Sequence, residues 1–215
     1  MGNKISTVLD KLKDLLSLFK TDKQVSLTIL GLDAAGKTTL VNLLNNNTVS
    51  TVPTIGFNAE EITIDKTTIR LWDVGGQTTI INFWKEYVKN TDGLIFVIDI
   101  ADTARYVKAF EAFSQLTEHL KENIPVLLLL NKTDLIANNI LKNEKIDEIR
   151  QIFNCDDIDG MIINNKKYKS RIIDCSVKNE QHNMITNPNY SIVSSNIYTG
   201  FRWVMKIADS KEQLY

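Results

Sequence analysis

The sequence predicts an α/β fold in which a mostly parallel, six-stranded, doubly wound sheet carries helices on both faces. Short apolar runs rich in β-branched residues alternate along the chain with longer segments of helical periodicity. Four of these runs are followed at once by a glycine-rich or polar motif, and open α/β sheets bind ligands at that end of their strands. A chain of 215 residues with 43% hydrophobic residues is sufficient for a single well-filled core.

Each apolar run is expected to form one strand, and segments with apolar residues every three or four positions are expected to form helices. The expected strands cover residues 25–30, 58–64, 67–73, 93–99, 125–130 and 171–175, and the expected helices cover 38–46, part of 78–90, 103–122, 143–153 and 197–210. The polar stretches 154–169 and 179–197 are predicted to be longer surface loops. The second is either a tolerated insertion or a partner-specific loop.

A phosphate-binding loop is predicted between the first strand and the first helix of the sheet domain. The stretch GLDAAGKTT fits G-x-x-x-x-G-K-[ST], and its glycines let successive N–H groups close around phosphate oxygens. Lys37 is expected to reach the β- and γ-phosphates, and the Thr38 hydroxyl to bind Mg²⁺. The alternative is a plain turn. The expected nucleotide contacts here are Asp33, Ala34, Ala35, Gly36, Lys37, Thr38 and Thr39.

A second motif, WDVGGQ, ends another predicted strand. Asp73 is an acidic residue at the strand end, which suits a Mg²⁺ ion held through water. Gly75 and Gly76 give a backbone that approaches the γ-phosphate and moves.

Two further motifs indicate that the base is guanine. In NKTD, Asp134 is expected to accept from two N–H groups of guanine, which adenine does not match, while Asn131 bonds the base and its flanking loop and the Lys132 stem covers the ring. In SVK, Ser176 to Lys178, the backbone N–H of Val177 is expected to meet a base oxygen. A lone NKxD is weak evidence, but four motifs at four strand ends are strong evidence.

These motifs, together with PTIGF at 53–57, resemble the ADP-ribosylation-factor (Arf/Arf-like) family of small GTPases over nearly the whole chain. Asp33 and WDVGGQ favour this family over the Ras, Rab and Rho branches. Segments such as WKEYVKNTDGLIFVIDIAD are most similar to the Arf-like branch associated with release of lipidated cargo in cilia.

The resemblance implies a GTP/GDP switch that slowly hydrolyses GTP with Mg²⁺. Thr54 matches the family's mobile-loop threonine that completes the Mg²⁺ shell, and Gln77 matches the residue that orients the attacking water. Phe57, Trp72 and Tyr87 match an aromatic trio that faces effectors, although such a trio is more often core in an arbitrary chain. Exchange factors, GTPase-activating proteins and effectors are the implied partners of a monomer. Charged residues usual after this Gln are replaced here by Thr78, Thr79 and Ile80.

Residues 1–20 are expected to be an amphipathic helix ahead of the GTPase domain at 21–215. MGNKIS fits an N-myristoylation signal on Gly2, and apolar residues from Ile5 to Phe19 recur at helical spacing. This helix either lies reversibly in a membrane interface through residues 2–19 or packs permanently on its own domain. The resemblance implies both in turn: docked with GDP and released with GTP. It also implies a cytoplasmic protein that visits an intracellular membrane, of the Golgi or the cilium.

Net charge and cysteine content argue against a nucleic-acid-binding protein and against a disulfide-rich secreted protein. A net charge of −1 gives no global attraction to nucleic acid, and two cysteines do not make a disulfide framework. Two alternatives to the switch stay open: a guanine-nucleotide-binding interaction module without useful turnover, and a P-loop ATPase or kinase, which NKTD disfavours. The loop up to Thr54 holds no arginine finger, so turnover is expected to be about 10⁻⁴ s⁻¹ without an activating partner.

Overall fold

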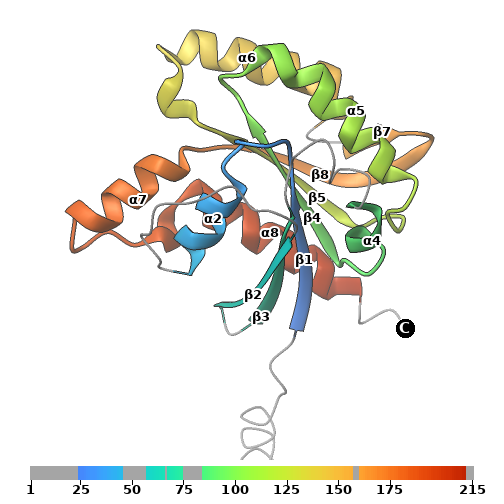
Figure 1. Cartoon of the computed structure of the whole chain (residues 1–215), viewed down its shortest axis with the longest axis horizontal. Helices are drawn as coiled ribbons and strands as arrows, with labels where there is room; N and C mark the ends of the chain where they lie inside the picture. The colour runs from blue at the N-terminus through green and yellow to red at the C-terminus, as the bar shows by residue number, and fades with distance from the viewer. Residues whose placement is uncertain (1–23, 46–56, 66, 75–83, 157–159, 212–215) are drawn as a thin grey trace, which may run out of the picture.

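A computed structural model of the chain describes residues 24–45, 57–65, 67–74, 84–156 and 160–211 (Figure 1). Within these residues eight strands form one sheet in the order β2-β3-β1-β4-β5-β8-β7-β6. The predicted α/β class is confirmed. The predicted count of six strands is too low, because β6 and β7 extend the sheet beyond β8.

The centre of the sheet is parallel. Leu27 of β1 pairs with Leu71 of β3 and with Gly93 of β4, and β4 and β5 continue in parallel register. Strands β4 and β5 are buried almost throughout, as expected for apolar runs covered on both faces. The bounds are β1 Gln24–Leu30, β2 Phe57–Ile64, β3 Thr67–Val74, β4 Gly93–Asp99, β5 Pro125–Asn131 and β8 Lys166–Asp174. Among the pairs that these six strands form with one another, only β2–β3 is antiparallel, and β8 is antiparallel to β7 on its other side.

Helices cover both faces of the sheet (Figure 1). One face packs on α2 (Lys37–Leu44), α7 (Val177–Thr186) and α8 (Asn196–Lys211), and the other on α4 (Trp84–Val88), α5 (Tyr106–Thr117) and α6 (Asn139–Ile152). Three 3-10 turns complete the described elements: η1 (Thr103–Arg105), η2 (Thr133–Leu135) and η3 (Ile192–Ser194). Helix α8 turns its apolar side to the sheet, and its residues Phe201, Val204 and Met205 are buried.

An aromatic cluster fills the α5–α6 side of the core. The Phe96 and Phe113 ring centroids lie 5.1 Å apart, and Phe113 and Phe153 lie 5.6 Å apart. Such pairs contribute about 0.5–1.5 kcal/mol each beyond their burial. The aromatic face of α5 therefore belongs to the core, with Phe110 packed at its margin.

The prediction that residues 154–169 form a loop is wrong. They form β6 (Cys155–Asp156), β7 (Gly160–Ile163) and the first residues of β8. Met161, Ile163 and Tyr168 are buried in alternation with exposed neighbours, which is the period of a half-buried strand. The turn residues Asn164 and Asn165 have φ of 51° and 62°, the left-handed pair that a tight hairpin requires.

The stretch 179–197, also predicted to be a loop, begins with most of α7 and ends in the first turn of α8. The Ser176 hydroxyl accepts from the Asn179 backbone N–H at 3.1 Å and so caps α7. Helix α7 is largely polar and half-exposed, so its sequence lacks the apolar stripe that would have indicated a helix.

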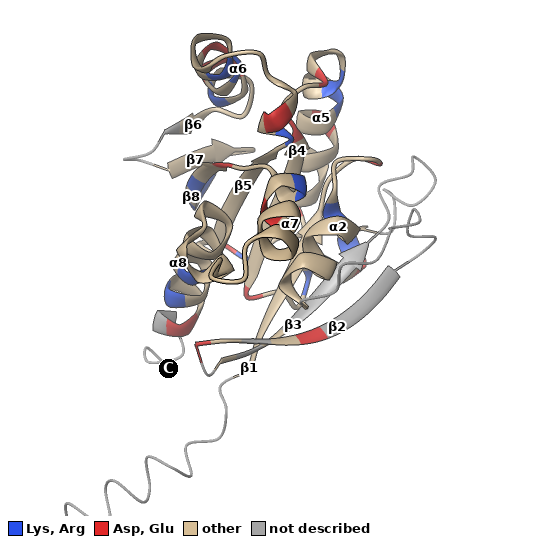
Figure 2. Ribbon diagram, turned by 90° about the vertical axis from the view of Figure 1, so that its left-hand side faces the viewer, with Lys and Arg blue, Asp and Glu red and all other residues tan. Residues whose placement is uncertain are grey.

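The predicted N-terminal helix at 1–20 lies outside the described residues. Among the helices that the structure does describe, none combines the length and apolarity needed to cross a membrane. Blue and red segments are interspersed over α5, α6 and α8 in Figure 2, in keeping with a net charge near zero.

Candidate nucleotide-binding site

The predicted motifs meet at one edge of the sheet. Strands β1, β3, β4, β5 and β8 are parallel, so their carboxyl ends lie together, flanked by α2 and α7 (Figure 1). The GLDAAGKTT loop follows β1, NKTD starts at the last residue of β5, and SVK follows β8. The sheet topology therefore places three of the four motifs side by side, and the backbone of Asp73 beside Ile29 adds the fourth.

Two glycines in the loop after β1 stand at positions where any side chain would clash with a neighbouring segment. Gly31 has φ of 147°, and a Cβ there would lie 2.2 Å from the carbonyl oxygen of Val97. Gly36 has φ of 100°, and a Cβ there would lie 2.3 Å from Nδ2 of Asn131. Ala34 between them is also left-handed, with φ of 60°. The loop is thus closed against β4 and the base loop at positions where only glycine fits.

Lys37 is held inside this loop. Its side chain is buried, and Nζ donates to the carbonyl oxygens of Gly31 at 2.9 Å and Leu32 at 3.0 Å. Lys37 also begins α2, so Thr38 and Thr39 stand in the first helical turn. A cation at a helix N-terminus whose backbone N–H groups point outward is suited to phosphate.

Asn131 joins three motifs through one buried side chain. Its Nδ2 donates to the Ala35 carbonyl at 2.9 Å, and its Oδ1 accepts from the Val177 N–H at 3.0 Å. Asn131 thus bonds the loop after β1 and the loop after β8, and its expected bond to the base stays a prediction. In this structure the Val177 N–H donates to Asn131, because the phosphate and base loops approach each other closely enough for one amide to bridge them. Its expected contact with a base oxygen stays a prediction.

The other base-loop residues are held by side-chain partners. Asp134 is exposed, and its Oδ1 accepts from the Ser176 hydroxyl at 2.6 Å. Lys132 has φ of 70°, and its Nζ lies 2.7 Å from Oδ2 of Asp99 at the end of β4. Lys178 is exposed at the start of α7. Asp134 and Lys132 are therefore presented in fixed positions on the same edge as the phosphate loop.

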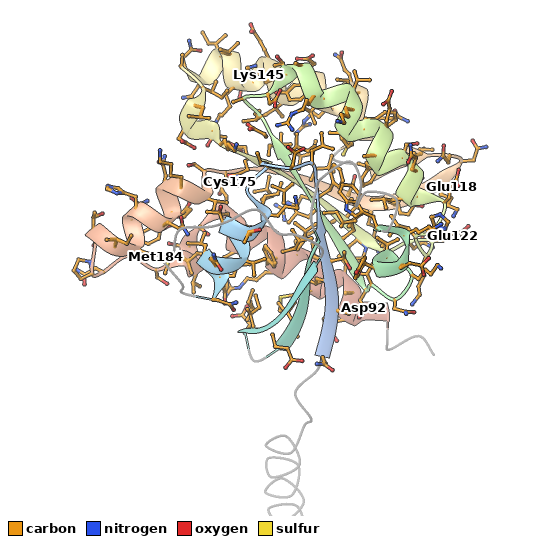
Figure 3. The ribbon with its side chains drawn as sticks, viewed as in Figure 1. Asp92, Glu118, Glu122, Lys145, Cys175 and Met184 are labelled. Atoms are coloured by element: carbon orange, nitrogen blue, oxygen red, sulfur yellow. The ribbon has the colours of Figure 1, made fainter. Side chains whose placement is uncertain are left out.

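Neither of the two cysteines, Cys155 and Cys175, forms a disulfide, and both are buried. Cys175 lies next to Ser176, directly under the base loops (Figure 3). Its Sγ is 3.9 Å from Oδ1 of Asn131, and burial raises the pKa of the thiol far above its usual value. A thiol kept neutral by burial is an inert packing group, not a nucleophile.

Three charged residues at this edge were missed by the sequence analysis. Arg105 in η1 donates to both the backbone oxygen and the carboxylate of Asp33, and pairs with Asp102. Asp99 holds Lys132. The available signal was the unpaired acidic residue in the phosphate loop, which implied a cation from elsewhere in the chain.

Several predicted positions are placed only in part. Thr54, Gly76, Gln77 and Gly2 lie outside the described residues. Phe57 and Trp72 are placed by their backbones in β2 and β3, and Tyr87 is half-buried against the α5–α6 core.

The described residues fit Mg²⁺ by the chemistry of their donors. They contain no cluster of three His, Cys, Asp or Glu side chains suited to a metal. Thr38 supplies a hydroxyl at the helix start, and Asp73 is the next-to-last residue of the neighbouring strand β3. Hydroxyl and carboxylate oxygens are the ligands this ion prefers when phosphate supplies the others.

The fold and the site together define a P-loop nucleotide-binding protein with guanine-type base loops. The model of the ADP-ribosylation factor family matches residues 11–206, and the chain belongs to that family.

Curated relatives agree with this assignment. The chain is 35% identical to an ADP-ribosylation factor of Encephalitozoon cuniculi over 96% of its own length and 95% of the relative's. It is 40% identical to human ADP-ribosylation factor-like protein 4A over 69% of its length and 75% of the relative's.

Solved structures support the fold. The structure of the Arl6 (BBS3) small GTPase from Trypanosoma brucei with the analogue GppNp aligns with a TM-score of 0.65 at 20% identity, covering 87% of this chain and 99% of that one. A small GTPase of Encephalitozoon cuniculi, SAR1 in complex with GDP, aligns with a TM-score of 0.60 at 21% identity, covering 99% and 96%.

Proposed function

We propose that this protein is a switch controlled by GTP and GDP, of the Arf/Arf-like type, in which the nucleotide occupies the edge described above. The observation that carries the proposal is the Asn131 amide, which bonds Ala35 of the phosphate loop and Val177 of the third base-side motif at once. Because one side chain holds both loops, a base that binds in its loop also stabilises the phosphate loop. Family membership supports guanine nucleotide and Mg²⁺ as the ligands.

The proposed roles follow from position. Lys37 and the backbone from Asp33 to Thr39 bind the phosphates, and Asp134 with Lys132 selects and covers the base. Ser176, Val177 and Lys178 support the base from the start of α7. Thr38, Thr54 and Asp73, the last through water, would hold Mg²⁺, which when bound neutralises charge on the phosphate oxygens. Gly76 would approach the γ-phosphate from the loop after β3.

Gln77→Leu is expected to leave GTP binding intact and to slow hydrolysis in the presence of an activating protein by about 100-fold, since an apolar side chain does not orient the attacking water. Single-turnover hydrolysis of GTP, with and without a GTPase-activating protein, measures this. The matched control is Gln24→Leu at the start of β1, because this residue lies at the amino end of the strand, away from the nucleotide site.

Unchanged activated hydrolysis in Gln77→Leu would remove the proposed role of Gln77. If the wild-type protein binds GTP tightly but no candidate activator accelerates turnover, the alternative function, an interaction module without useful turnover, replaces the switch as the better account.

We further propose that nucleotide state is coupled to membrane contact through residues 2–19. Strand β1 begins beside a groove of about 300 Å³ that is lined by Val25, Asp65, Thr67, Arg202, Met205, Lys206 and Asp209. The groove lies between the β2–β3 turn and α8, beside the first residues of β1. Docking of the predicted helix there would place its apolar face against Val25 and Met205 and cover part of that face in the GDP state.

An ion pair connects the two walls of this groove. Nη2 of Arg202 donates to Oδ1 of Asp65 at 2.9 Å, and the guanidinium stacks 4.9 Å from the Tyr198 ring centroid. This pair lowers the pKa of the Asp65 carboxyl below its usual value. A movement of the β2–β3 hairpin that closes the groove would have to rearrange this contact, so the pair bears directly on the proposed release of the helix.

The expected result with liposomes is preferential co-sedimentation of the myristoylated protein when it is loaded with a non-hydrolysable GTP analogue. One acyl chain alone gives only about 10⁴ M⁻¹, so release of the apolar helix face must add to it. Linkage then requires liposomes to favour GTP over GDP loading. Protein lacking residues 2–19 is the control, and it should exchange nucleotide readily without lipid. Equal membrane binding in both nucleotide states would eliminate the coupling and leave the nucleotide site untouched.

The finer assignment within the family is also a proposal. We infer a cytoplasmic monomer that recruits effectors through Phe57, Trp72 and Tyr87 at an intracellular or ciliary membrane, in trafficking of the Arf-like type. Its sequence segments favour the branch linked to release of lipidated cargo. A pull-down that compares GTP-loaded with GDP-loaded protein tests this, and equal capture of all partners in both states would contradict it.

A further inference from the structure

Arg105 supplies a cation to the phosphate loop from outside all four motifs. Its Nη1 lies 3.1 Å from Oδ1 and 3.3 Å from the backbone oxygen of Asp33, which stands between Gly31 and Gly36. Its Nε donates to Oδ2 of Asp102. One guanidinium therefore joins the loop after β1 to the turn after β4, 72 positions away in the sequence.

The guanidinium is fixed in this position by the turn that carries it. Arg105 ends η1, and its backbone N–H donates to the Asp102 oxygen at 3.1 Å. The next residue, Tyr106, is buried and donates from its hydroxyl to the Ile100 oxygen. The Arg105 side chain is 30% exposed, whereas Asp33 is 53% exposed. A planar guanidinium on this turn is thus held against a more exposed loop carboxylate.

Asp33 poses an electrostatic problem at a phosphate site. A carboxylate in a loop whose backbone N–H groups surround phosphate oxygens repels the bound anion. The penalty grows with ligand charge, and GTP carries one more phosphate than GDP. The Arg105 contact compensates this charge in part, since the same guanidinium also pairs with Asp102. Hydrogen bonds between charged groups are stronger than those between neutral groups.

We infer that Arg105 is a positioning residue that neutralises Asp33 and thereby sets the preference of the site for GTP over GDP. The inference rests on the proposed nucleotide site. Arg105, which lies in the connection between β4 and α5, is thereby added to that site. Its role is to favour GTP over GDP and is not purely structural.

The test measures the affinities for GTP analogue and GDP in four proteins: wild type, Arg105→Gln, Asp33→Asn and the double variant. Arg105→Gln is expected to weaken GTP binding about tenfold, the effect of losing one charge-assisted interaction, and GDP binding less. Asp33→Asn removes the repelling charge, so it is expected to bind GTP at least as tightly as wild type. The double variant is expected to recover most of the loss seen in Arg105→Gln.

The affinities of these four proteins distinguish compensation of the Asp33 charge from a purely structural contact between two turns. If the contact only fastened the loop, Asp33→Asn would break it as well and would be as defective as Arg105→Gln, with equal losses for GTP and GDP. That result overturns the inference. Arg105→Lys keeps the charge and is expected to retain most of the preference for GTP. The deficit of Arg105→Gln should also shrink as salt rises, because exposed charges are screened.

Asp102→Asn is the matched control, because it removes the second carboxylate on Arg105 while leaving Asp33 and its partner in place. Its preference for GTP over GDP is expected to stay within about twofold of wild type, far less than one lost charge-assisted bond. Wild-type protein that binds no guanine nucleotide would refute the proposed function itself. Wild-type binding with an unaltered Arg105→Gln would refute only the role of Arg105.

Discussion

Replacing Asp134 with asparagine is expected to lower the affinity for GTP by roughly 10²–10⁴-fold, through loss of two charge-assisted hydrogen bonds to guanine. Xanthine carries an oxygen where guanine has its amino group, so XTP should bind Asp134→Asn better than GTP does. Competition of GTP and XTP against a fluorescent GDP derivative measures both effects.

Ser176→Ala is the matched control for this variant. It removes the hydroxyl that donates to Asp134 at 2.6 Å, along with the cap of α7, but keeps the carboxylate. We expect a loss of about tenfold or less and no gain for XTP, because the base-reading group is still present. If Asp134→Asn binds GTP as tightly as wild type, the base site has been assigned to the wrong residue.

Gly36→Ala is expected to lower the free energy of unfolding by about 2–5 kcal/mol and to abolish tight nucleotide binding. An L-residue is strained at φ of 100°, and the new Cβ would lie 2.3 Å from Nδ2 of Asn131. Asn131 would have to move and would lose its bonds to Ala35 and Val177. Denaturant unfolding and nucleotide titration measure the two effects.

Gly200→Ala in α8 controls for the added methyl group. Its Cβ would also be close to a neighbour, 2.9 Å from Cδ2 of Leu127, but that atom ends a flexible side chain. The gain in helix propensity, about 1 kcal/mol, offsets part of this crowding. A stability loss in Gly36→Ala no larger than that in Gly200→Ala would mean that the loop adapts and that Asn131 does not fix it.

Much of the fold follows from local pattern. The strands β1, β4 and β5 are continuous apolar runs bounded by turn residues, and such runs in this order specify a parallel sheet. The β6–β7 extension was missed because its apolar positions alternate inside a stretch dominated by Asn, Asp and Lys. The signal was present in Met161, Ile163 and Tyr168 flanking the Asn164–Asn165 turn.

The site was predicted where it depends on motifs and missed where it depends on distant contacts. Gly36, Lys37 and Asp134 could be predicted because their spacing within each motif defines the chemistry. Arg105 could not, since its partner Asp33 is brought near only by the pairing of β1 with β4. The bond between the Val177 N–H and Asn131 could not be predicted for the same reason, because it joins two loops that are far apart in the sequence.

Hydrogen exchange of the protein loaded with GDP or with a non-hydrolysable GTP analogue tests the switch most directly. The account predicts that exchange differs between the two states in residues 2–19 and in residues 54–77, which include the β2–β3 hairpin. Strands β4 and β5 are predicted to stay equally protected. Strands β4 and β5 are buried at the centre of the sheet and open only with global unfolding. Identical exchange in both states across 54–77 would contradict a nucleotide-controlled switch.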